Sequence, residues 1–171
     1  MQQIFLPVYL REDLELSAAR VATYLALAQI VGLFVQPAMG HYSDRFGRKV
    51  VLVPAMTAMG ILFFALTYAD PGVQLVITIV AAGAFLYSLH TIFIAAAMDV
   101  AGGEVQSTVV SLIYGASFLG TLSPVFAGLI ADKFGTHITF VFGGSIVLLA
   151  TVVLAFTKLP KTLNQITADD A

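Results

Sequence analysis

The stretch Gly40–Lys49, GHYSDRFGRK, decides the fold class because it concentrates charge between two long apolar segments. One acid and three bases fall within six positions, as Asp44, Arg45, Arg48 and Lys49. The chain carries no Asp, Glu, Lys or Arg from 21 to 43 before this group, or from 50 to 69 after it. A short charged stretch between two such segments is typical of a tight loop at which two membrane helices meet water.

The composition also indicates a membrane protein, because 59% of the 171 residues are hydrophobic and 11% are charged. A soluble domain needs far more polar surface than this. Complete membrane spans, each with the roughly 20 apolar residues that a helix needs to cross a bilayer, are predicted at 18–39, 50–69, 73–98, 105–131 and 138–157. The apolar run within residues 1–10 is too short to cross, and 158–171 are predicted to be a cytoplasmic tail. The predicted fold is therefore an all-α, polytopic membrane helix bundle, with a single domain over residues 1–171.

A weaker copy of the charged stretch recurs later in the chain. Gly40–Gly47 reads GHYSDRFG and Gly128–Gly135 reads GLIADKFG, so that G-x-x-x-D-[R/K]-F-G occurs twice, 88 positions apart. That separation is about the length of three membrane helices with their loops. The alternative is the chance recurrence of a Gly-rich loop with one acid and one base.

The distribution of Lys and Arg predicts the orientation, because short basic loops are retained in the cytoplasm. The bases divide between the two predicted sides as Arg45, Arg48, Lys49, Lys158 and Lys161 against Arg11, Arg20 and Lys133. We expect the majority side to be cytoplasmic. The two copies of the charged stretch then end helices that run in opposite directions, which predicts a 3+3 inverted repeat.

The first copy closely resembles the loop signature of the major facilitator superfamily of secondary transporters, G-x-x-x-D-R-x-G-R-[R/K]. Every specified position of the signature is matched, at Gly40, Asp44, Arg45, Gly47, Arg48 and Lys49. The resemblance implies half of a permease in the cell (inner) membrane, in which residues 1–10 are a partial sixth span. Such a permease moves a small solute by alternating access, with or without a coupling proton or cation.

Two features indicate the C-terminal half of such a permease, truncated at its N-terminus. The family's N-terminal half usually carries an Arg inside its fourth helix, whereas the corresponding span here, 73–98, has none. The chain also ends in a short polar tail, KLPKTLNQITADDA. Half a permease cannot form a two-sided cavity, so we expect this chain to be a fragment or to need an N-terminal half as its partner.

The resemblance assigns a cytoplasmic latch to the charged stretch. In the family, the acid of the signature and the Arg four residues later break and reform contacts as the two halves rock, which implies this role for Asp44 and Arg48. The Arg can also meet an acid at the cytoplasmic end of the half's fourth helix, here Asp99. Gly40 is expected to permit close helix approach and Gly47 a tight reversal. The alternatives are static loop packing and bases that serve only as retention signals.

A second candidate site lies inside the span 73–98. His90 is the residue in the predicted membrane interior that can change charge near neutral pH, and Tyr87 and Thr91 lie within one helical turn of it. Polar groups at such depth usually face a cavity or a partner. This face is predicted either to contact the solute or relay a proton, or to hydrogen-bond a neighbouring helix. Weaker candidates, expected to form interhelical hydrogen bonds, are Tyr24, Gln29, Gln36, Tyr114 and Ser117.

A stripe of small residues follows in the span 105–131. Ala116, Gly120, Pro124 and Gly128 recur at every fourth position and therefore share one helix face. Small residues at that spacing allow a neighbouring backbone to approach, and Pro124 is expected to bend the helix. The stretch is similar to the family's antiporter stripe at only two specified positions, so we interpret it as a helix-packing stripe.

Several function classes have no support in the sequence. The chain contains no Cys and no P-loop, H-E-x-x-H or G-x-S-x-G pattern, and its net charge is only −2. We expect no enzyme activity, cofactor, metal site or nucleic-acid partner. The expected partners are the lipid bilayer, a small-molecule solute and the missing N-terminal half. The rival hypothesis is a non-transporting membrane scaffold or assembly protein that retains the half-bundle.

Overall fold

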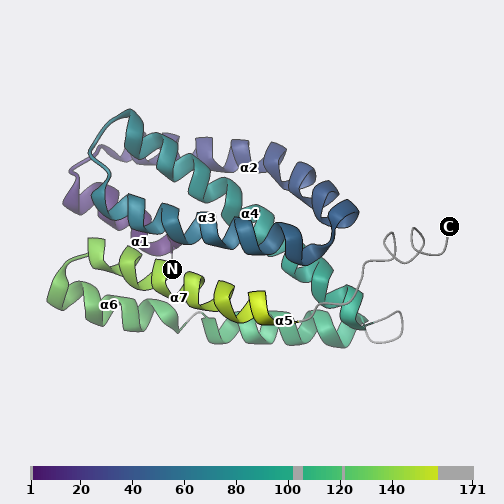
Figure 1. The fold of residues 1–171 in the computed structure, drawn as a ribbon. Coiled ribbons are helices and arrows are strands. Elements are labelled where there is room, and N and C mark those ends of the chain that lie inside the picture. The colour runs from purple at the N-terminus through teal and green to yellow at the C-terminus, as the bar shows by residue number, and fades with distance from the viewer. Residues whose placement is uncertain (1, 102–105, 121, 158–171) are drawn as a thin grey trace.

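The computed structural model describes residues 2–101, 106–120 and 122–157 (Figure 1). Within these ranges the chain forms helices and no strand, so the predicted all-α fold is confirmed. The elements are α1 (Gln2–Val8), a π-helical turn η1 (Tyr9–Asp13), α2 (Ala18–Phe46), α3 (Arg48–Tyr68), α4 (Val73–Ala101), α5 (Gln106–Gly120), α6 (Ser123–Phe134) and α7 (His137–Phe156).

The long helices pack side by side (Figure 1). Helix α4 contacts α2 on one side and α3 on the other, and α3 in turn packs against α7. The N-terminal segment is also part of the core, because Leu6 of α1 and Tyr9 and Leu10 of η1 are buried. The Tyr9 ring meets Phe140 of α7 edge to face, with 5.2 Å between ring centroids. The turn η1 is therefore in contact with the last described helix.

Small residues set the spacing of the two most extensive helix pairs. Between α2 and α4, a Cβ atom on Gly83 would lie 2.6 Å from the Cβ of Ala28. Between α3 and α7, a Cβ atom on Gly144 would lie 3.1 Å from the carbonyl oxygen of Gly60. In a membrane, van der Waals packing drives helix association, so the absence of a side chain at these points lets the backbones approach.

The two copies of the repeated sequence have the same local structure. Gly47 ends α2 with φ 101° and ψ 146°, and Gly135 ends α6 with φ 89° and ψ 155°. Each glycine N–H donates to the carbonyl four residues earlier, Ser43 at 3.1 Å and Ala131 at 2.8 Å. Glycine adopts this positive-φ backbone without steric cost. Each copy therefore ends one helix and leads at once into the next.

The charged stretch is more helical than a loop. Helix α2 continues to Phe46 and α3 begins at Arg48, so only Gly47 separates them. The apolar segment alone predicted an end near residue 39. Charge marks where a helix leaves the hydrocarbon, whereas the helix itself continues until the backbone reverses at a glycine.

The predicted span 105–131 is divided into two helices. Helix α5 ends at Gly120 and α6 begins at Ser123, with the two following one another along the same edge of the bundle (Figure 1). Pro124 is the second residue of α6. In this first turn a proline is tolerated, because its missing N–H would have no partner within the helix. The expected bend is thus a break in the structure.

Four of the described helices are long and apolar enough to cross a membrane, namely Ala18–Phe46, Arg48–Tyr68, Val73–Asp99 and His137–Phe156. The outward faces of the bundle are apolar, as Phe34, Leu33 and Phe156 illustrate with exposed fractions of 72%, 67% and 85%. Such faces require lipid or another apolar partner. The chain is therefore an integral, multi-pass membrane protein.

Candidate functional site

Arg48 joins α2, α3 and α4 at one end of the bundle. Its Nε donates to Asp99 Oδ2 at 2.8 Å, and its Nη1 pairs with Asp44 Oδ1 and donates to Ser43 Oγ at 3.3 Å. Asp44 lies one helical turn before Arg48, in the last turn of α2, while Asp99 lies near the end of α4. The structure thus brings the three latch candidates together from three helices.

The burial of this cluster is graded. The side chain of Arg48 is 11% exposed, that of Asp99 is 22% exposed and that of Asp44 is 50% exposed. Ser43, which the sequence analysis did not single out, is fully buried beneath the guanidinium. A base this poorly hydrated requires a carboxylate and further hydrogen-bond partners. Asp99 supplies the more buried pair and Asp44 the more exposed one.

The other residues of the charged stretch lie outside this cluster. Arg45 is exposed, with its guanidinium 5.4 Å from the centroid of the Phe46 ring. Lys49 Nζ donates to the carbonyl oxygen of Thr157 at 2.7 Å. Thr157 caps the C-terminal end of α7, where a cation is favoured by the helix dipole. A Cβ atom on Gly40 would meet nothing within 4 Å, so no close helix approach occurs there within the described residues.

The three cavity candidates of α4 do not share one environment. Tyr87 is half-buried and lines a pocket, whereas His90 is exposed and does not line it. Thr91 Oγ1 accepts a hydrogen bond from Gln36 Nε2 of α2. This contact confirms the expected interhelical hydrogen bond for Gln36.

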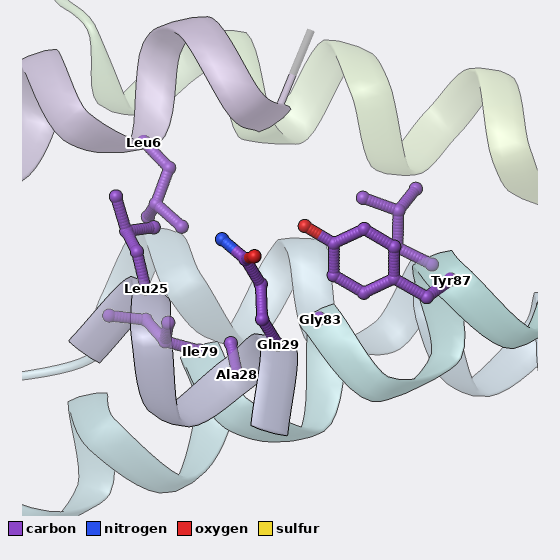
Figure 2. A pocket seen from close by; sticks show the side chains of 8 residues that line it. Leu6, Leu25, Ala28, Gln29, Ile79, Gly83 and Tyr87 are labelled. Carbon is purple, nitrogen blue, oxygen red and sulfur yellow. The ribbon is translucent and has the colours of Figure 1, made fainter. Parts of the chain in front are cut away.

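The pocket lies between α1, α2 and α4 and has a volume of about 280 Å³ (Figure 2). Its lining is apolar except for two side chains, and consists of Leu6, Leu25, Ala28, Gln29, Ile79, Gly83, Leu86 and Tyr87. Figure 2 shows the amide of Gln29 and the hydroxyl of Tyr87 pointing toward one another across the open space. The pocket can therefore offer hydrogen bonds within an otherwise apolar surface.

The described members of the small-residue stripe show no close packing against a neighbouring helix. A Cβ atom on Gly120 or Gly128 would meet nothing within 4 Å. The side chain of Ala116 lies outside the described residues. The break before Pro124 also separates the first two members of the stripe from the last two. A packing role for this stripe stays a prediction.

Sequence reasoning missed the glycines that shape the pocket. Gly83 allows α4 to approach Ala28, and a Cβ atom on Gly32 would lie 3.1 Å from the ring of Tyr87. A glycine inside an apolar helical pattern is the available signal, since it usually has a packing or functional reason. Among the described residues, no group of three or more His, Asp or Glu side chains is placed to hold a metal ion.

Comparison with known proteins identifies relatives of the whole chain. The sequence profile of the Major Facilitator Superfamily matches residues 1–170. The chain is similar to the multi-drug resistance efflux pump PmrA of two Streptococcus pneumoniae strains, with 30% identity over 169 residues. The match covers 90% of this chain and 40% of each relative, so the chain spans about two fifths of their length. No solved structure matches significantly.

Proposed function

The chain belongs to the Major Facilitator Superfamily, and from that premise we propose that it forms one half of a secondary transporter that exports a small organic solute by alternating access. The half-bundle supplies one wall of the translocation path, and a second half supplies the other. The similarity to proteins named as multi-drug efflux pumps favours export as the direction. The C-terminal half is the better assignment, because α4 carries no Arg in its interior.

The Arg48 cluster is the observation that carries this proposal. It links the ends of three helices through one guanidinium, at the place where the sequence matches the transporter signature. Asp44 lies on the exposed side of the cluster, so its contact with Arg48 can exchange with water or with another chain segment at modest cost. Asp99 remains paired with Arg48 while the contact between Asp44 and Arg48 is open. This arrangement suits a latch that opens and closes during each cycle.

The proposed orientation places the Arg48 cluster in the cytoplasm and the α3–α4 turn outside. The excess of bases near the cluster supports this assignment. The matching ends of α2 and α6, at Gly47 and Gly135, support an inverted repeat in which the second copy lies on the opposite side of the membrane.

Transport by the full permease that contains this chain tests the proposal. Cells expressing it should keep a fluorescent amphiphile at low internal concentration, and Arg48→Ala should abolish most of this export. Loss of about 1.5–3 kcal/mol of charged hydrogen bonding would shift the balance between the two open states by roughly ten- to hundredfold. Surface expression, measured by antibody labelling, should be retained.

Arg45→Gln is the matched control, because Arg45 is an adjacent base of the same stretch whose guanidinium lies 5.4 Å from the centroid of the Phe46 ring. It should export normally. An Arg48→Ala permease that exports at the wild-type rate would contradict the latch. A wild-type permease that moves no solute in any direction would instead support the non-transporting scaffold.

A further inference from the structure

The Gln29–Tyr87 pocket lies at the depth and at the junction where a transporter of inverted repeats is expected to hold its solute. Gln29 is the twelfth of the 29 residues of α2, and Tyr87 is the fifteenth of the 29 residues of α4. Both side chains therefore lie near the middle of a membrane-crossing helix. Helix α2 belongs to the first repeat and α4 to the second, so the pocket lies between the repeats.

The two polar groups of the pocket have unmet hydrogen-bonding capacity. Within the described part of the chain, neither the Gln29 amide nor the Tyr87 hydroxyl is hydrogen-bonded. Each group can both donate and accept. In the hydrocarbon region of a bilayer an unpaired polar group is costly, so such groups usually have a partner or face a polar occupant. In this structure two such polar groups face the same pocket.

Packing between α2 and α4 fixes the position of both groups. The missing side chain at Gly32 leaves room for the Tyr87 ring on the surface of α2. The close approach of Gly83 to Ala28 holds the two helices together one turn away. Gln29 and Tyr87 therefore project from a closely packed crossing of two helices, and placement on packed helices favours selective hydrogen bonding.

The chemistry of the lining defines the class of ligand. The eight lining residues carry no charged side chain, and six of them are Leu, Ile, Ala or Gly. A charged solute would lose its hydration here without gaining a counter-ion. The volume of about 280 Å³ is at the small end of ligand pockets, which favours a molecule of one or two rings.

We propose that this pocket binds a small, uncharged, largely apolar solute through one hydroxyl, carbonyl or amide group held by Gln29 and Tyr87. This inference rests on the proposed transport function, because it names the class of solute that the half-bundle would carry. It assigns Gln29 and Tyr87 as specificity-determining residues, and Gly32 and Gly83 as positioning residues.

Direct binding tests the inference without requiring transport. The 171-residue chain is placed in phosphatidylcholine nanodiscs and titrated with naphthol as the probe, with empty nanodiscs measured for subtraction. The chain contains no Trp, so naphthyl fluorescence is read without overlapping indole emission. Naphthalene, naphthalenesulfonate and naphthylmethylammonium are titrated in parallel. Naphthol should bind at least about threefold more tightly than naphthalene, which lacks the hydroxyl, and about tenfold more tightly than either ion.

Two conservative variants remove the polar groups while retaining their volume. Gln29→Leu and Tyr87→Phe should each weaken naphthol binding by about threefold to tenfold, with naphthalene binding unchanged. Tyr68→Phe and Gln74→Leu are the matched controls, because both positions are exposed and lie outside the pocket. The controls should bind like the wild type, and helicity by circular dichroism should be equal in all five proteins.

Three results would overturn the inference: naphthol binding that both pocket variants leave unchanged, equal binding of the ions, or equal binding of naphthalene. The transport function fails separately. If the pocket variants lose naphthol binding as expected but the full permease moves no naphthol-like solute, the binding site stands and the transport proposal is wrong. If the permease transports such a solute equally well with Tyr87→Phe, the transport proposal stands and this site is wrong.

Discussion

Replacing Asp99 by Asn should destabilise the bundle more than replacing Asp44 by Asn, although both acids contact the same guanidinium. Asp99 is 22% exposed and accepts from Arg48 Nε at 2.8 Å, whereas Asp44 is 50% exposed. Loss of the more buried charged hydrogen bond should cost about 1.5–3 kcal/mol in the free energy of unfolding. Loss of the more exposed ion pair should cost about 0.2–1 kcal/mol.

The assay is unfolding of the purified chain in mild detergent by titration with SDS, followed by helical circular dichroism. Each acid variant is also combined with Arg48→Met, so that double-mutant cycles isolate the two pair energies. Asp70→Asn, in the exposed turn between α3 and α4, is the control and should leave the midpoint unchanged. Added salt should reduce the Asp44 pair energy more than the Asp99 pair energy. Equal pair energies, or a larger one for Asp44, would refute the graded burial of the cluster.

Three further outcomes are expected. Gly83→Leu should lower the free energy of unfolding by about 1–3 kcal/mol or more in the same SDS titration, because the new side chain has no room between α2 and α4. Gly115→Leu is the control and should leave the free energy of unfolding unchanged, because its side chain enters open space. In intact cells, a single Cys at His41 should be protected from a membrane-impermeant thiol reagent, whereas a single Cys at Asp70 should be labelled. The reverse pattern would invert the proposed orientation. His90→Gln should alter transport by the full permease while leaving naphthol binding intact, and unchanged transport would reduce His90 to a structural residue.

Sequence reasoning was most reliable where one residue type has one dominant physical consequence. Long uncharged apolar segments predicted a helical membrane bundle because a bilayer admits few other structures. The repeat of G-x-x-x-D-[R/K]-F-G predicted related helix ends, and Gly47 and Gly135 do adopt the same backbone. The ends themselves were harder to predict, since α2 continues through the charged residues as far as Phe46.

Contacts between distant segments could not be derived from periodicity. The sequence offered the stripe that includes Gly120 and Gly128 as a packing surface, whereas the structure packs α2 and α4 through Gly83 and its neighbours. Both patterns contain small residues at helical spacing. Which of them meets a partner depends on how the helices are arranged, and spacing along one helix does not contain that information.

The sequence by itself determined that this chain is a bundle of membrane helices with a charged signature at one end, because hydrophobic length and charge placement act through the solvent and need no partner. Tertiary structure alone decided that Arg48 is shared between a buried and an exposed acid, and that Gln29 faces Tyr87 across a pocket. Gln29 and Tyr87 are 58 positions apart, on α2 and α4. Only the packing of those helices, through the residues that lack side chains, brings the two polar groups to one place.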